Sequence, residues 1–191
     1  MAIVVLGAFH AQILTGVAAF MSVPDRLEPA DVLLVLYHEG HTVPFAAAGL
    51  YRRRYASQLV LGRMQATRLE ALGLLQPRHE VWRKVFEAEG VPPEAIALIG
   101  HRLEDDVDLG RALAVHLAQR AKTRVIVVAS AQASRLSRDD LRRGLAGAPV
   151  ELRMYPVALR EFDEHTWWKH RRGWLTYFDA YYLWFVRLLR H

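Results

Sequence analysis

The stretch that decides the fold is residues 30–62, ADVLLVLYHEGHTVPFAAAGLYRRRYASQLVLG. It contains an apolar run at 31–37, a polar loop at 38–41, a helix-like segment at 44–54 and a second apolar run at 58–62. This order is typical of a crossover unit that joins two parallel strands through a helix. Because such units place ligand sites at the carboxyl ends of their strands, the polar loop predicts where a site should lie.

The same alternation continues to the end of the chain. Further apolar runs predict strands at 95–99, 124–130 and 150–155. Helical periodicity separates the strands, at 79–89, 106–121 and 134–145. The pattern predicts a three-layer, Rossmann-like α/β fold with a doubly wound sheet of about five mainly parallel strands.

The two ends of the chain differ from this pattern. Residues 1–24 contain no Asp, Glu, Lys or Arg, but His10 and Gln12 interrupt the apolar run. The segment approaches the length of a membrane span, yet we expect a helix that packs on the domain or lies in a membrane interface. Residues 173–191 are crowded with Trp, Tyr and Phe, which predicts an aromatic helix that either seals the sheet or meets a membrane surface. We therefore expect an apolar helical segment, 1–24, and a single domain, 25–191.

Composition narrows the classes of function. The 191 residues are 52% apolar and include no cysteine, which excludes disulfides, thiolate metal sites and cysteine nucleophiles. The formal net charge of +5 is compatible with solvated helix faces or with a surface that meets phosphates or anionic lipid headgroups. No nucleic-acid-binding motif accompanies the charge, so we do not expect a nucleic-acid partner.

Several segments, in this order, resemble one protein family. ADVLLVL at 30–36 resembles the opening AD-AIVVLGG of the YdcF-like, SanA-like and ElyC-like proteins (domain of unknown function 218), and LYRRRYA at 50–56 resembles their LYRRGYAP. GVP at 90–92 and WW at 167–168 match further pieces of that pattern, so the resemblance runs from about residue 24 to the C-terminus. It implies a Rossmann-like domain at the bacterial cell envelope, either membrane-associated or soluble. It does not indicate on which side of the membrane the domain lies. It also implies a link to barrier function and to peptidoglycan or lipid-carrier metabolism.

The chain departs from the family at the expected ligand site. The glycine turn after the first strand is replaced by 37–40, YHEG, and the Ser-Gly-Gly after the second strand by 62–64, GRM. The family's histidine in S-x-x-H-x-x-R is Ala133 here. Because glycine turns let a backbone approach a phosphate closely, these replacements indicate a divergent member that holds its ligand differently.

We expect a small anionic, phosphate-containing ligand at the carboxyl ends of the strands. Arginine guanidinium groups and helix N-termini bind such anions, and the strand ends share one edge of the sheet. The candidate ligand-binding residues are His38, Glu39, Gly40, Gly62, Arg63, His101, Gln132 and Arg135, with Arg102 as a further source of positive charge.

Other readings of the strand ends stay open. Asp105, Asp106 and Asp108 fit either helix capping or general-base catalysis, and Ser130 is a candidate nucleophile that would need a base nearby. These residues define the alternative of a hydrolase or transferase. A non-catalytic scaffold protein on the same fold is the other alternative.

A metal site is a third alternative at the strand ends. His38 and His41, with His101, would offer imidazole ligands. However, His38 and His41 are three residues apart on a loop, whereas the zincin motif needs two histidines four apart on one helical face. We therefore expect no metal, and the cofactor is left unassigned.

Overall fold

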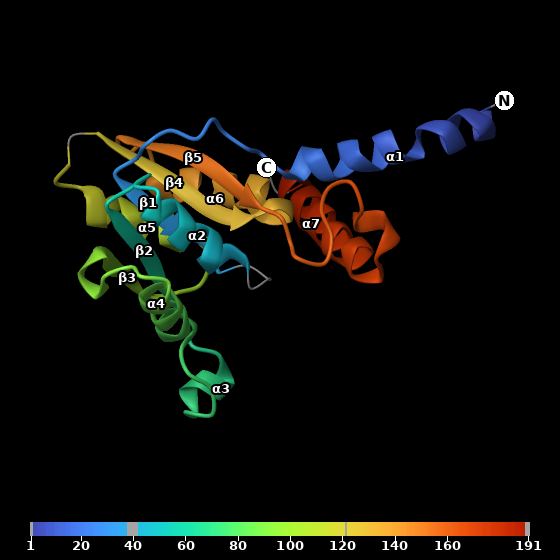
Figure 1. Cartoon of the computed structure of the whole chain (residues 1–191). Coiled ribbons are helices and arrows are strands. Elements are labelled where there is room, and N and C mark those ends of the chain that lie inside the picture. The colour runs from blue at the N-terminus through green and yellow to red at the C-terminus, as the bar shows by residue number, and fades with distance from the viewer. Residues whose placement is uncertain (1, 38–41, 121, 190–191) are drawn as a thin grey trace.

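A five-stranded, all-parallel sheet forms the centre of the molecule, with strand order β3-β2-β1-β4-β5 (Figure 1). The structure is a computed structural model that describes residues 2–37, 42–120 and 122–189, with side chains from residue 9 onward. The strands are β1 (Val32–Val35), β2 (Gln58–Met64), β3 (Ile96–Leu103), β4 (Thr123–Ser130) and β5 (Val150–Val157). The predicted Rossmann-like fold class is confirmed.

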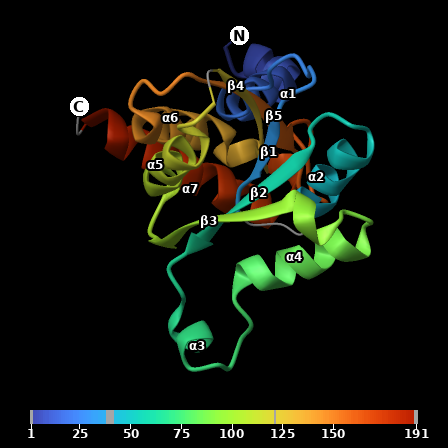
Figure 2. The same cartoon turned by 90° about the vertical axis from the view of Figure 1, so that its left-hand side faces the viewer.

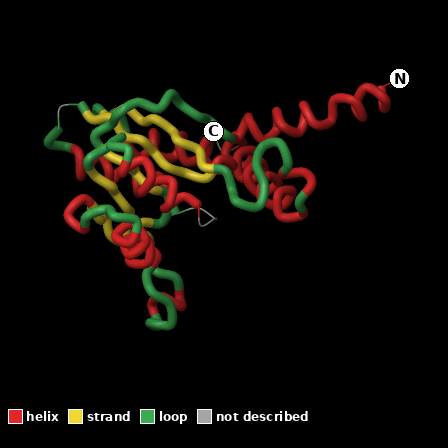
Figure 3. The backbone as a smooth tube through the Cα atoms, viewed as in Figure 1, coloured by secondary structure: helices red, strands yellow, loops and turns green. Residues whose placement is uncertain are grey.

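Helices cover both faces of the sheet (Figure 3). α2 (Thr42–Arg52) and α4 (Arg78–Ala88) pack on one face, and α5 (Asp106–Leu117) and α6 (Ser134–Leu145) pack on the other. The position of β1 explains why its sequence contains no polar residue. Leu33 belongs to the apolar core between the sheet and α2 and α4, Leu34 belongs to the core on the α5 and α6 face, and neither is accessible to solvent. A strand covered on both faces needs apolar side chains at every position.

Two of the differences from the expected boundaries lie at the carboxyl ends of β2 and β3. β2 continues to Met64 and β3 to Leu103, both beyond the predicted ends at 62 and 99. A short helix, α3 (Arg68–Ala71), follows β2 in a segment where no element was predicted. α3 and its flanking loops project from the body of the molecule beside α4 (Figures 1 and 2).

Short 3₁₀ helices complete the chain: η1 (Pro93–Ala95) precedes β3, η2 (Ala131–Ala133) follows β4 and η3 (Trp167–Lys169) precedes the C-terminal helix. η2 and η3 take part in the contacts that hold the two terminal helices to the body.

The terminal helices, α1 (Ala2–Met21) and α7 (Arg171–Leu189), pack on one another beyond the sheet. Ala18 and Met21 of α1 are buried with Tyr177 of α7 and Leu136 of α6 in a third apolar cluster. The cluster belongs to neither core that flanks the sheet, so α7 does not cover a sheet face. The remainder of α1 extends away from the body (Figure 1). Within the described part of the chain, no helix has the length and apolar character needed to cross a membrane.

Candidate ligand cleft at the carboxyl ends of β2 and β3

A cleft of about 480 Å³ opens where β2 and β3 end. Its walls come from the carboxyl ends of both strands, the loop that leads to α3 and the start of α4. We call it the β2/β3 cleft, and its lining includes Tyr37, Gly62, Arg63, Met64, Thr67, Glu70, Arg78, His79, His101, Arg102 and Glu104.

An irregularity in the strand pairing shapes this cleft. Gly62 of β2 pairs with Ile99 of β3, but Met64 pairs with Leu103. Three residues of β3, 100–102, therefore oppose a single residue of β2. Bulges of this kind bend a strand and redirect its side chains, and they occur frequently beside functional sites.

The backbone of the bulge takes up left-handed conformations. Gly100 has a φ of 67° and Arg102 a φ of 53°. For an arginine this conformation costs about 1 kcal/mol relative to ordinary backbone. His101 and Arg102 are both exposed and line the cleft as a result of this turn.

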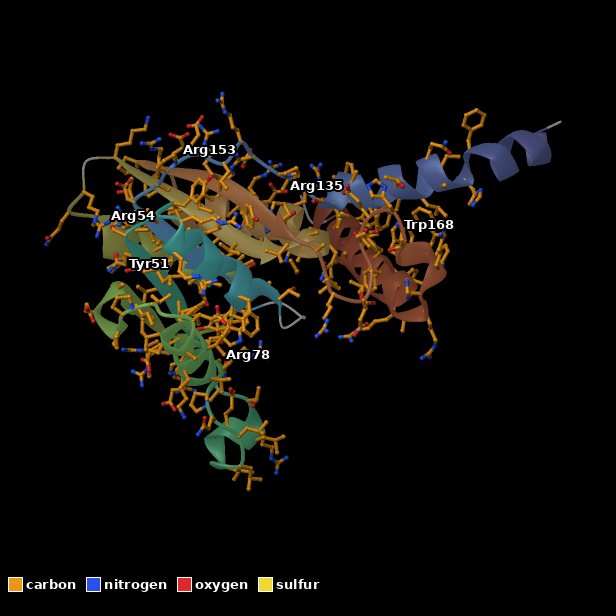
Figure 4. The ribbon with its side chains drawn as sticks, viewed as in Figure 1. Tyr51, Arg54, Arg78, Arg135, Arg153 and Trp168 are labelled. Carbon is orange, nitrogen blue, oxygen red and sulfur yellow. The ribbon has the colours of Figure 1, made fainter. Side chains whose placement is uncertain are left out.

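Three guanidinium groups line the cleft. Arg63 and Arg102 are exposed, and neither has a hydrogen-bond or ion-pair partner among the described residues. Arg78, at the start of α4 (Figure 4), donates a hydrogen bond from Nη1 to the Tyr37 carbonyl oxygen at 3.4 Å. Within the described ranges, two of the three groups are therefore available to bind an anion with charge-assisted hydrogen bonds.

The carboxylates of the cleft are unequal. Glu70 accepts hydrogen bonds from the backbone N–H groups of Thr67, at 2.7 Å, and Arg78, at 2.9 Å. These bonds, the one from Thr67 first, lower the pKa of Glu70 despite some opposing desolvation, so its charge is held by the local backbone. Glu104 is exposed and partly opposes the positive charge of the arginines.

Tyr37 forms the wall nearest β1. Its ring packs against Trp82 with 4.6 Å between the ring centroids. Its hydroxyl group is buried and has no hydrogen-bond partner within the described residues. Burial raises the pKa of Tyr37, and the charge of Arg78 opposes this only in part, so the phenol is neutral at physiological pH.

Gly62 serves packing in this structure. A Cβ atom at Gly62 would lie 2.8 Å from Cδ1 of Leu109 and 3.1 Å from Cδ1 of Leu103. The missing side chain therefore makes room for side chains of α5 and β3, and not for a ligand.

The three predicted aspartates lie outside the lining of the cleft. Asp105 is the N-cap of α5, accepting hydrogen bonds from the N–H groups of Val107 and Asp108, both at 2.9 Å. Asp108 accepts from the N–H of Glu104 at 3.2 Å and forms an ion pair with Arg111. The capping interpretation of Asp105 is confirmed.

Asp106 lies close enough to Asp140 of α6 for its charge to contribute to the raised pKa of that carboxyl, whose main cause is burial. Asp106 thus belongs to the contact between α5 and α6, on the far side of the sheet from α4.

The predicted residues that follow β4 are distributed among other surroundings. Gln132 lines a second cleft, of about 310 Å³, together with Asp163 and His165. Ser130 is fully buried, and its Oγ has no hydrogen-bond partner among the described residues. Arg135 lies over the ring of Phe20 of α1, 4.1 Å from the centroid, and so contributes to the attachment of α1.

Of the predicted ligand-binding residues, the structure therefore brings Gly62, Arg63, His101 and Arg102 together. The predicted residues His38, Glu39, Gly40 and His41 lie outside the described residues. Within the described ranges, no group of three His, Asp or Glu side chains could hold a metal ion.

The sequence placed Tyr37 at the strand end, but Glu70 and Arg78 were not predicted as parts of the cleft. One signal was present: Thr67 and Glu70 form a capping box, T-x-x-E, which predicts the start of a helix. This helix turns the chain back so that Arg78 reaches the strand ends.

The chain matches no protein-family model, and a search of curated proteins finds no significant match.

Proposed function

We propose that this chain is a divergent YdcF-like protein of the bacterial cell envelope that binds a small phosphate-containing ligand in the β2/β3 cleft. Its process would be peptidoglycan or lipid-carrier metabolism, as the resemblance at 30–36 and 50–56 implies. The observation that carries the ligand class is a pair of guanidinium groups, Arg63 and Arg102, that have no partner among the described residues and lie in a cleft at the carboxyl ends of parallel strands.

The geometry supports phosphate over a neutral ligand. Among the described residues, the cleft offers three guanidinium groups against two carboxylates, and one of those, Glu70, already accepts two backbone hydrogen bonds. Arginine binds phosphate oxygens through paired N–H donors, and such charge-assisted bonds are stronger than neutral ones. His79 and His101 add ring N–H groups that can donate hydrogen bonds to the ligand.

Binding is favoured over catalysis at this site. Asp105 and Asp108 are engaged at the start of α5, and Ser130 is buried at the end of β4. None of them lines the β2/β3 cleft. The scaffold alternative predicts strand ends filled by bulky side chains; Tyr37 and Met64 are present, yet a cleft of about 480 Å³ remains between them and β3.

A thermal-shift screen of the full chain tests the proposal. The compounds are inorganic phosphate, pyrophosphate, nucleotides and a water-soluble short-chain prenyl phosphate, so that adsorption to lipid does not contribute. We expect at least one of them to raise the melting temperature, since a ligand that binds only the native state stabilises it. If no phosphate compound does so, the proposed ligand class is wrong.

Arginine variants then locate the site. Replacing Arg63 or Arg102 with alanine should weaken binding of the stabilising compound by about tenfold or more, because each removes charge-assisted hydrogen bonds. Arg53→Ala is the matched control: Arg53 is an exposed arginine outside the cleft lining. Equal affinity in all three variants would place the ligand elsewhere.

A further inference from the structure

The outward face of α7 is an apolar stripe. Its members are Trp174, Phe178, Tyr182, Phe185 and Leu189, each between 52% and 70% exposed. They recur every three or four residues and therefore lie along one side of the helix. We call these five residues the α7 stripe. Large apolar surfaces of this kind mark sites that meet a membrane or another protein.

A second apolar surface on α1 continues the α7 stripe. Phe9, Ile13 and Phe20 are exposed and share one face of α1 by the same spacing. Phe20 stacks on Tyr181 of α7 with 5.9 Å between centroids and meets Trp184 edge-on at 5.2 Å. The two helices therefore present connected apolar surfaces at the end of the molecule away from the β2/β3 cleft (Figure 4).

The charges around these helices favour one class of partner. Residues 1–24 carry no charged side chain, and Asp179 is the one acidic residue in the sequence of α7. Lys169, at the end of η3, and Arg171, at the start of α7, are exposed and form no ion pair within the described chain. Lipid interfaces accept Trp and Tyr beside Lys and Arg, and anionic headgroups attract the cations. A second copy of the chain also has a formal net charge of +5, so the two copies would repel one another electrostatically.

We propose that the α7 stripe and the exposed face of α1 form a docking surface for an anionic lipid bilayer. The helices would lie in the interface, with their aromatic rings at the level of the headgroups and acyl boundary. This proposal deepens the envelope association proposed above by naming the partner surface, and it does not depend on ligand binding in the β2/β3 cleft.

Vesicle flotation of the full chain tests the surface. The vesicles contain either phosphatidylcholine alone or phosphatidylcholine with phosphatidylglycerol. We expect binding to the mixed vesicles that weakens with added salt. The double variant F178Q/F185Q should bind at least about tenfold more weakly, since each Phe would lose the burial of a large apolar side chain. Glutamine is a good helix former, so the helix itself should persist.

The matched control is L72Q/L74Q, which removes two leucines that are 63% and 69% exposed beside α3. It should bind vesicles as the unchanged chain does. Quenching of tryptophan fluorescence by brominated lipids gives a second readout on the unchanged chain, with no need for any variant to fold.

Three results would overturn the proposal: no flotation and no quenching with mixed vesicles, an equal loss in both double variants, or a dimer in sedimentation that only F178Q/F185Q dissociates. The last would identify a second copy as the occupant of the α7 stripe. Phosphate binding in the cleft is measured separately in the absence of lipid, so failure of one proposal does not decide the other.

Discussion

At the scale of single residues, the chain places arginines where the backbone favours glycine. Arg54 and Arg102 have φ values of 60° and 53°. Left-handed backbone is strained for residues that carry a Cβ. Arg102 lines the β2/β3 cleft, and strained backbone is frequent at functional sites. Arg54 follows the end of α2 and does not line the cleft. We therefore expect that a substitution can relieve its backbone strain without affecting the proposed ligand site.

Arg54→Gly should stabilise the fold by about 1 kcal/mol because glycine adopts this conformation without a clash. The N–H of Tyr55 donates to the Leu50 carbonyl at 3.1 Å and that of Arg54 to the Tyr51 carbonyl at 2.8 Å (Figure 4 labels Tyr51 and Arg54). These are the bonds of a helix end that prefers glycine at position 54, as in the motif LYRRGYAP. Urea denaturation measures the change.

Arg53→Gly is the control for that measurement. Arg53 does not have a positive φ, so glycine there should lower stability by about 0.5–1 kcal/mol through added chain entropy. Equal effects of the two glycines would show that the left-handed position is not the cause.

At the scale of elements, α7 is held by a buried ion pair as well as by its aromatic residues. Asp140 of α6 is 4% exposed, and its Oδ2 lies 2.6 Å from Nη1 of Arg187. Arg143 pairs with the other carboxylate oxygen. Burial raises the pKa of Asp140, and the two arginines oppose that effect. The pair orients the outer half of α7, and with it the α7 stripe.

Asp140→Asn should destabilise the protein by about 2 kcal/mol, since it leaves Arg187 half-buried without a counterion. The neighbouring Asp139→Asn is the control, because Asp139 is exposed and pairs with Arg138 only at 3.9 Å. That exposed pair should contribute less than about 1 kcal/mol. Urea denaturation compares the two, and a similar small loss in both would show that the buried pair does not anchor α7.

The elements also show what could be predicted from sequence. Strands β1 and β4 were recognisable because they are buried on both faces and consist of uninterrupted apolar residues. The bulge in β3 could not be recognised from the sequence, because His101 and Arg102 are polar. The extra residues of the bulge are defined only by how β3 pairs with β2. Helix α3 has only four residues, Arg68–Ala71, which are too few to show helical periodicity.

The position of the candidate site could be predicted from the sequence, but only some of the residues that line it could be. Arg63, His101 and Arg102 directly follow or end apolar runs, so the rule for parallel sheets placed them at one edge. Arg78 reaches that edge only because the chain turns at α3, which is a tertiary effect. Arg135 follows β4 in sequence, yet the aromatic ring of Phe20 on α1 draws it away.

At the scale of the whole molecule, the described structure has two separate regions of interest. The β2/β3 cleft lies at the carboxyl ends of β2 and β3, and the surfaces of α1 and α7 lie beyond the carboxyl ends of β4 and β5 (Figure 1). A chain docked through α1 and α7 would keep the β2/β3 cleft accessible from the aqueous side. The two proposals are therefore compatible in one molecule.

The strand order also bears on how the chain acquires its structure. β1, β2 and β3 are neighbours in sequence and in the sheet, whereas β4 must return to the other edge of β1. Pairings between distant residues form slowly because the intervening chain must first be ordered. During synthesis, the β1 edge that pairs with β4 would therefore stay unpaired until β4 has left the ribosome. In refolding followed by pulsed hydrogen exchange, we expect amides of β2 and β3 to become protected before those of β5. Simultaneous protection would instead mean that the sheet assembles in one cooperative step.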